Sequence, residues 1–111
     1  MDCIETINRR RSIRKFKNMD IGKDNIDILL KAAQAAPSAG NMQGRDFIIV
    51  TDRTIKRELV VAAHNQHFIA SAPVIIVVVA NIRRSSSRYG NRGELFAIQD
   101  ATASVMNIML A

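Results

Sequence analysis

The sequence predicts an α+β fold in which helices outnumber strands. Two observations support this class: four segments repeat their apolar residues at helical spacing, and two short runs are rich in β-branched residues. The elements follow in the order helix, helix, strand, helix, strand, helix. Because two strands alone make a poor sheet, either further strands come from a partner chain or from missing sequence, or the fold is mostly helical.

The first predicted helix covers residues 2–10. Its Ile4 and Ile7 lie one turn apart, and Asp2 stands where an N-cap is expected. Residues 11–22 show no helical period and are expected to be extended or looped.

A second helix is predicted over residues 23–36. Its inward positions share one face at helical spacing: Ile26, Leu29, Leu30 and Ala33. Pro37 stops this helix, because proline lacks an amide hydrogen and clashes with the preceding turn. Residues 37–45 follow with the composition of a loop: two glycines, a proline and short polar side chains.

Two strands are predicted over residues 47–50 and 74–79. The second is an unbroken run of Val and Ile, which is typical of a strand buried on both faces. Between them, Asp52 is expected to cap a helix that ends near residue 63, while residues 64–72 are ambiguous. The inward residues of that helix are expected to be Ile55, Leu59 and Val60.

The chain is expected to end in its longest helix, over residues 94–111, after a polar loop at 81–93. The residues expected to face inward are Leu95, Ile98, Ala101, Val105, Ile108 and Met109. A face of small residues, Ala97, Ala101 and Ser104, would let another backbone approach closely. The helical pattern has no stop signal, so the chain is expected to be a single domain that lacks its C-terminal part.

Composition excludes several classes of protein. A chain of 111 residues fits one domain, and its 48% hydrophobic content can form a core. The single cysteine, Cys3, cannot form an internal disulfide, which argues against a secreted framework. The longest apolar run, 73–80, is too short to span a bilayer. A cytoplasmic protein without a membrane partner is expected.

The net charge of +6 gathers in two clusters. The first contains Arg9, Arg10, Arg11, Arg14 and Lys15, and the second contains Arg83, Arg84, Arg88 and Arg92. Such a charge is compatible with nucleic-acid binding, but two separate clusters fit a compact anion such as phosphate about as well. The few aromatic residues and the lack of a recognition motif make nucleic acid the least favoured partner.

Two constellations could carry chemistry. In residues 10–14, three guanidinium groups and the Ser12 hydroxyl could enclose a phosphate, although from spacing alone a solvated basic turn is the favoured reading. In residues 37–43, amide and hydroxyl groups beside Gly40 could meet a flat ligand, although an ordinary connection is the simpler reading. His64 and His67 lack a third ligand, so no metal is expected. No paired carboxylates stand out, so redox chemistry would have to come from a cofactor.

Taken together, these stretches resemble the nitroreductase family of FMN enzymes, in its short, single-domain prokaryotic form. The resemblance is carried, in order, by residues 10–16, 36–43 and 97–111, with the loop 88–93 before the last helix. It implies helices around a mixed sheet, with the long last helix at the centre of a homodimer. The chain departs from the family where Gly44 and Arg45 replace a proline and an aromatic residue, and where family members continue for some tens of residues.

The resemblance also implies a shared FMN site. Arg10, Arg11, Ser12 and Arg14 would hold the phosphate and the pyrimidine side of the flavin. Pro37, Ser38, Ala39 and Asn41 would approach the same flavin from the other subunit, and Gln66 would touch it. Hydride would pass from NAD(P)H through the flavin to an electron-poor acceptor, such as a nitroaromatic or a quinone, by a ping-pong mechanism. The alternative is a non-catalytic flavin-binding or dimerisation remnant of the family.

Overall fold

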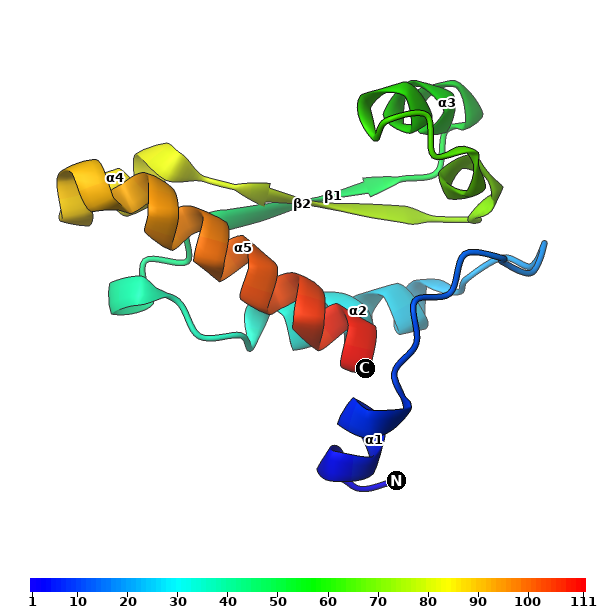
Figure 1. The fold of residues 1–111 in the computed structure, drawn as a ribbon, viewed down its shortest axis with the longest axis horizontal. Helices are drawn as coiled ribbons and strands as arrows, with labels where there is room; N and C mark the ends of the chain where they lie inside the picture. Colours follow the sequence, from blue (N-terminus) through cyan, green and yellow to red (C-terminus); the bar gives the residue numbers. More distant parts are fainter.

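A computed structural model describes residues 1–111 as helices packed around one pair of strands (Figure 1). The helices are α1 (Cys3–Arg9), α2 (Lys23–Gln34), α3 (Arg53–Ala62), α4 (Ile82–Tyr89) and α5 (Gly93–Leu110). The strands are β1 (Arg45–Val50) and β2 (Ile75–Ala80), and the short 3-10 turns are η1 (Ala39–Asn41), η2 (His67–Ser71) and η3 (Gly90–Arg92). The predicted α+β class is confirmed, with one helix, α4, more than expected.

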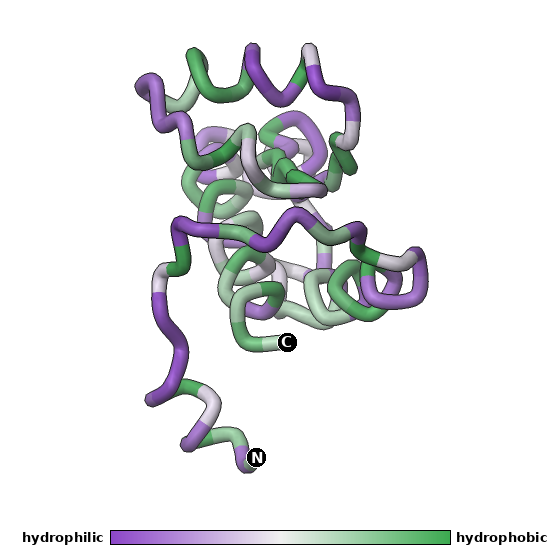
Figure 2. The backbone as a smooth tube through the Cα atoms, turned by 90° about the vertical axis from the view of Figure 1, so that its right-hand side faces the viewer, coloured by the Kyte–Doolittle hydropathy of each residue, from purple (hydrophilic) through white to green (hydrophobic).

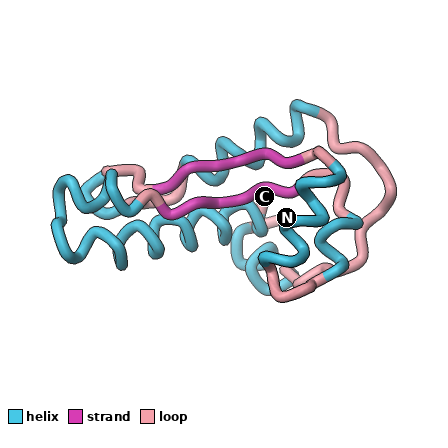
Figure 3. Tube along the Cα trace, turned by 90° about the horizontal axis from the view of Figure 1, so that it is seen from above, coloured by secondary structure: helices cyan, strands magenta, loops and turns pink.

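The sheet is a single antiparallel pair, in which Arg45 lies opposite Ala80 and Val50 opposite Ile75. Residues 1–111 therefore contribute only one antiparallel pair to the expected sheet. The expectation that residues 74–79 are buried on both faces is wrong, since β2 is half-buried and Val79 is 36% exposed. The reason is that α5 is the main helix in contact with the pair. Figure 3 shows the two strands lying side by side, seen from above.

Helix α5 is the centre of the molecule and contacts α4, α2 and both strands. Its small residues Ala97, Ala101 and Ser104 are buried. The backbone that approaches them belongs to the same chain, so this face is not free for another copy, contrary to expectation. Most of the large residues expected to face inward are instead exposed in this chain: Leu95, Ile98, Val105 and Met109.

Helix α4 corrects the predicted polar loop at 81–93. Asn81 caps it, because its side-chain oxygen accepts a hydrogen bond from the Arg84 amide at 2.9 Å. The serines that indicated a loop form the face that packs on α5: Ser85 is fully buried, and a side chain at Gly93 would collide with Ser86. Small side chains let the two helices approach closely, which a composition count does not reveal.

Helix α1 forms as predicted but packs on little. Asp2 caps it through a 2.7 Å bond to the Glu5 amide, while Ile4 and Ile7 are 68% and 51% exposed. Figures 1 and 2 show α1 and the segment after it standing away from the body. The radius of gyration, 15.2 Å, accordingly exceeds the roughly 13 Å of a compact chain of this length.

Helix α3 begins at its predicted cap, since Asp52 accepts from the Ile55 amide at 2.9 Å. Val60 is buried as expected, but Ile55, expected to face inward, is 47% exposed. No helix is both long and apolar enough to cross a bilayer. The cytoplasmic location stays a prediction.

Candidate functional site

The loop at 37–43 follows the C-terminal end of α2, where the last backbone carbonyl groups all accept hydrogen bonds. The last carbonyls of a helix have no partner within it and need one from elsewhere. In α2, Ala32 accepts from the Asn107 side-chain amide at 2.9 Å, and Ala33 accepts from the Ser104 hydroxyl at 2.8 Å. Ser104 and Asn107 therefore fix the end of α2, and with it the start of the loop, onto α5.

Arg45 holds the loop from the other side. Its side chain is only 3% exposed. Its guanidinium donates to four backbone carbonyl oxygens, those of Ala36 at 2.7 Å, Pro37 at 3.0 Å, Gln34 at 3.3 Å and Asp100 at 3.5 Å. It also donates to Oε1 of Gln43 at 3.0 Å. A cation at the C-terminus of a helix also complements its dipole. The departure from the family pattern at this position thus supplies a buried clamp for the loop.

Asp100 of α5 ties the two ends of the loop together. Its carboxylate is 4% exposed and accepts from the Ala39 amide at 3.0 Å and from the Gly44 amide at 3.3 Å. Gly44 packs closely against both neighbours, because an added Cβ would lie 3.1 Å from Oδ2 of Asp100 and 3.3 Å from Cβ of Ser85. The carboxylate of Asp100 therefore fixes the spacing between the beginning and the end of the loop.

The loop itself has a strained backbone. Gly40, Asn41 and Gln43 all have positive φ, near 55°, a region that residues other than glycine adopt rarely and that clusters at functional sites. Internal bonds hold this shape: Ser38 Oγ accepts from the Gln43 amide at 3.1 Å, and Asn41 Oδ1 accepts from Gln43 Nε2 at 2.7 Å. The side-chain nitrogen of Asn41, Nδ2, donates no hydrogen bond within the chain.

A hollow of about 350 Å³ lies between the loop and α5. Pro37, Ser38 and Ala39 form one wall, and Phe96 with Gln99 forms the other. The wall is extended by an aromatic pair, since the rings of Phe96 and Tyr89 meet edge to face with centroids 4.9 Å apart. A concave, partly apolar space beside a braced loop is typical of a small-molecule site.

The arginine cluster lies on the extended segment after α1. Arg10 ends the helix and is partly buried, while Arg11, Ser12 and Arg14 are exposed. Arg11 donates to the Asn8 and Arg10 carbonyls at 2.9 Å. The two ion pairs in the structure are Arg9–Glu5 and Arg84–Asp46. No carboxylate therefore neutralises Arg10, Arg11 or Arg14, and these groups can bind an anion.

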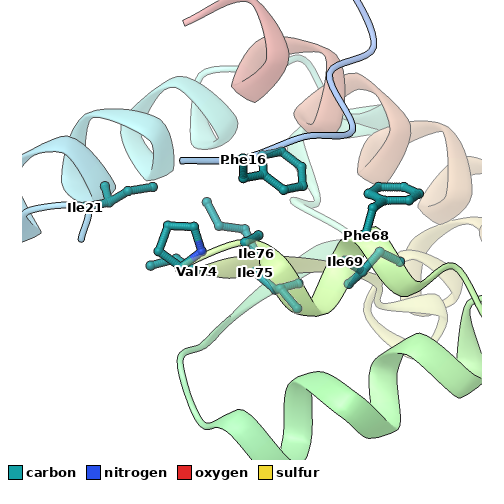
Figure 4. Close-up of a pocket in the computed structure, with 9 residues that line it drawn as sticks. Phe16, Ile21, Phe68, Ile69, Val74, Ile75 and Ile76 are labelled. Carbon is teal, nitrogen blue, oxygen red and sulfur yellow. The ribbon is translucent and has the colours of Figure 1, made fainter. Parts of the chain in front are cut away.

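The same segment continues onto an apolar hollow of about 320 Å³ (Figure 4). Phe16 and Ile21 form one side, and Phe68, Ile69 and the start of β2 form the other. The rings of Phe16 and Phe68 lie 6.3 Å apart. Gln66 caps η2 two residues before Phe68 and is exposed. This packing brings the region of Gln66 toward the arginine segment, as a shared ligand would require.

One carboxylate near the loop has a perturbed pKa. Asp46 accepts from the Asn81 amide at 2.8 Å and from Arg84 at 3.0 Å. The hydrogen bond from Asn81, followed by that from Arg84, lowers the pKa of Asp46 below its ordinary value of 3.8. Arg84 also donates to the Gln43 carbonyl at 2.7 Å. The Asp46 carboxylate therefore stays ionised and fixes α4 beside the end of the loop.

The predicted site residues thus fall into two separate groups in one copy of the chain. Pro37, Ser38, Ala39 and Asn41 lie together at the end of the molecule that holds α4. Arg10, Arg11, Ser12 and Arg14 lie toward α1, away from that loop (Figure 1). Sequence reasoning assigned no role to Asp100 or Arg45. Asp100 could have been noticed as a lone acid inside an apolar helical pattern, whereas Arg45 gave no sign of being buried.

Comparison with known proteins gives a consistent result. Residues 7–66 match the profile of the nitroreductase family. The FMN reductase (NADPH) of Bacillus subtilis is 37% identical to this chain. The match covers 84% of this chain and 37% of the reductase. A relative from Archaeoglobus fulgidus, assigned by name to the NAD(P)H nitroreductases, is 36% identical over 99% of this chain, which spans 60% of it.

Solved structures agree with these relatives. The FMN-dependent nitroreductase of Clostridium difficile superposes with a TM-score of 0.80 at 30% identity, covering 96% of this chain and 58% of its own. The NfrA1 nitroreductase of B. subtilis superposes with a TM-score of 0.87 at 30% identity. The match covers 98% of this chain and 49% of NfrA1. The chain therefore spans about half to three fifths of the solved relatives it matches, and it belongs to the nitroreductase family.

Proposed function

We propose that this chain binds FMN between two copies of itself and uses it to pass hydride from NAD(P)H to an electron-poor acceptor. The observation that carries the proposal is that one chain of the nitroreductase family contains both an arginine cluster without carboxylate partners, at 10–14, and a braced, strained loop, at 37–43. Relatives are named FMN reductases and FMN-dependent nitroreductases.

The arginine cluster fits the phosphate of FMN. Arg10, Arg11 and Arg14 offer planar donors within five residues, and a guanidinium can bind a phosphate through two parallel hydrogen bonds. The Ser12 hydroxyl has no partner in the chain and is free to add a bond. The positive charge of the cluster also stabilises negative charge on a bound ligand.

The loop at 37–43 fits the flat ring system. Gly40 adopts φ of 56°, and because it has no side chain, Tyr89 and Arg88 can pack directly against the loop. The Pro37 carbonyl is turned inward to Arg45, while the Asn41 side-chain amide remains a free donor. Such a loop presents donors to the polar edge of a flavin and places few acceptors against it.

A homodimer would bring the two groups together. In one copy the cluster and the loop are apart, and α5 exposes a stripe of large apolar residues: Leu95, Ile98, Val105, Met106 and Met109. With 3.6 residues per turn, these positions fall on one side of the helix. An exposed apolar stripe of this kind marks an interface, and a second copy is the partner we propose.

Bound FMN would supply the redox chemistry, taking hydride from NAD(P)H and giving it to a nitroaromatic, a quinone or a similar acceptor in two successive half-reactions. The residues of the chain bind and orient. Arg10, Arg11 and Arg14 hold the phosphate, and their charge favours the anionic form of the reduced ring. Arg45 and Asp100 keep the loop in one shape. No side chain acts as a nucleophile.

The experiment that tests the proposal is a titration of the purified chain with FMN, followed by visible absorbance and circular dichroism. We expect the chain to bind FMN, and Arg14→Ala to weaken binding on the order of 10- to 100-fold, since a hydrogen bond to a charged group contributes about 1.5–3 kcal/mol. Arg53→Ala, which removes an exposed arginine from α3, is the matched control and should bind as the wild type does. A chain that ignores FMN, or equal losses in both variants, contradicts the proposal.

Turnover separates an enzyme from a binding remnant. The FMN-loaded chain is mixed with NADPH or NADH and an acceptor, and nucleotide oxidation is followed at its near-ultraviolet absorbance. Acceptor-dependent oxidation is the expected result. FMN binding without oxidation would instead select the non-catalytic alternative.

A further inference from the structure

In the second arginine cluster, Arg84 fixes α4 beside the loop at 37–43, while Arg88 and Arg92 have no role in the site described so far. Arg84 and Arg88 are one turn apart on α4, and Arg92 follows in η3. Arg84 donates to the Gln43 carbonyl. A Cβ built on Gly40 would lie 3.1 Å from Nε of Arg88. Arg84 and Arg88 therefore lie along the loop at 37–43, and Arg92 follows them in sequence.

The cluster also borders the hollow beside the loop. The guanidinium carbon of Arg88 lies 5.7 Å from the centroid of the Tyr89 ring. Tyr89 meets Phe96 edge to face, and Phe96 lines the hollow together with Pro37 and Ser38. The cationic side chain of Arg88, the aromatic pair of Tyr89 and Phe96, and the hollow thus adjoin one another. A ligand with a planar ring and an anionic tail would satisfy all three.

The charges on α4 favour an anion. Arg83 and Arg84 occupy the first turn, which contains no acidic residue, although the positive end of a helix dipole disfavours cations there. Arg84 and Arg88 are like charges at the i, i+4 spacing that brings them together. Only Arg84 has a carboxylate partner. An anion bound to Arg88 and Arg92 would reduce the repulsion between Arg84 and Arg88.

We infer that Arg88 and Arg92 form the phosphate-binding part of a pyridine dinucleotide site, with the hollow at Phe96 for a planar ring. The inference rests on the proposed function, because the dinucleotide is its hydride donor. Guanidinium groups bind phosphate through paired hydrogen bonds. If they contact the phosphate that distinguishes NADPH from NADH, the chain will prefer NADPH, and if they contact the diphosphate, both will bind alike.

The test measures nucleotide binding without catalysis. NADP⁺, NAD⁺ and adenosine are titrated against the full 111-residue chain, and binding is followed by amide NMR shifts and calorimetry at two salt concentrations. We expect NADP⁺ to bind, adenosine to bind far more weakly, and Arg88→Ala/Arg92→Ala to weaken NADP⁺ on the order of tenfold or more. Tighter binding of NADP⁺ than of NAD⁺ selects the distinguishing phosphate, and equal binding selects the diphosphate.

Two further variants make the test selective. Arg88→Lys keeps the charge but loses the paired donors, so we expect intermediate affinity. Arg53→Ala/Arg57→Ala removes the same charge from α3 and should leave affinity unchanged. No binding of NADP⁺ to the wild type, or equal losses in both double variants, overturns the inference. An FMN titration in parallel separates the two proposals: if the wild type binds FMN but Arg88→Ala/Arg92→Ala leaves the affinity for NADP⁺ unchanged, this inference alone is removed.

Discussion

Replacing Arg45 by methionine tests whether the buried clamp holds the loop. Methionine has a similar length and no donors, so Arg45→Met leaves the volume of the side chain largely filled. It removes three bonds of 3.0 Å or less, to the Ala36 and Pro37 carbonyls and to Gln43 Oε1. The Ala36 carbonyl would then be buried without a partner, because Ala36 is only 3% exposed.

The expected loss of stability follows from two opposing terms. Three hydrogen bonds to a charged donor contribute about 1.5–3 kcal/mol each, or roughly 4–9 kcal/mol together. Against this, methionine avoids the cost of burying an ion, which is several kcal/mol, and Arg45 already leaves its Nε without a partner. We therefore expect Arg45→Met to lower the free energy of unfolding by about 2–4 kcal/mol.

Urea denaturation of the FMN-free chain, followed by far-ultraviolet circular dichroism at one protein concentration, measures this loss. The midpoint should fall by about 1–2 M with an unchanged slope. Arg53→Met on the exposed face of α3 is the control and should stay within about 0.5 kcal/mol of the wild type. If Arg45→Met also stays within that limit, the bonds of Arg45 do not stabilise the loop and the reasoning is refuted.

Three further predictions concern the same region. Asp100→Asn should lower the free energy of unfolding by about 1–3 kcal/mol, because one backbone amide hydrogen loses its acceptor. Amide hydrogen exchange should then become faster at Ala39 and Gly44, and unchanged exchange would contradict this. Gly44→Ala should lower the free energy of unfolding by about 1–3 kcal/mol through overpacking. Gly22→Ala, with nothing within 4 Å of the new Cβ, is the control and should change it by less than about 0.5 kcal/mol. Equal effects of the two variants on urea denaturation would refute the close packing of Gly44 against Asp100 and Ser85. The lowered pKa of Asp46 means that its charged form stabilises the fold above pH 3.8 and that this contribution is lost as the pH falls below that value. Asp46→Asn should therefore flatten the acid limb of the stability curve by at most about 1 kcal/mol, since the side chain is half exposed; an unchanged curve would show that the ion pair contributes nothing.

Local signals predicted much of the fold. The caps at Asp2 and Asp52 and the stop at Pro37 act through neighbouring backbone groups, and the structure confirms the helices that they delimit. Both strands also lie where β-branched runs placed them. These elements depend on residues a few positions apart, which is the range that periodicity and capping describe.

Contacts between distant segments could not be predicted in the same way. Helix α4 was missed because its serines resemble a loop until α5 covers them. The exposure of Ile98 and Val105 depends on which side of α5 the other elements occupy. The burial of Arg45 depends on three carbonyls contributed by the end of α2 and the loop. In each case the deciding partner lies far away in sequence or is backbone, and neither leaves a residue pattern.

The central claim, one flavin held by the arginines of one copy and the loop of another, can be tested by complementation. One chain carries Arg10→Ala/Arg14→Ala, and the other carries Gly40→Val, which places a side chain against Tyr89 at a position of positive φ. Alone, each should bind little FMN. Refolded together in equal amounts, they should recover FMN binding at about one quarter of the wild-type sites, since half of the dimers are mixed and each mixed dimer has one intact site. Binding no greater than the average of the two separate variants would show that both groups serve a site within one copy, and would contradict the account.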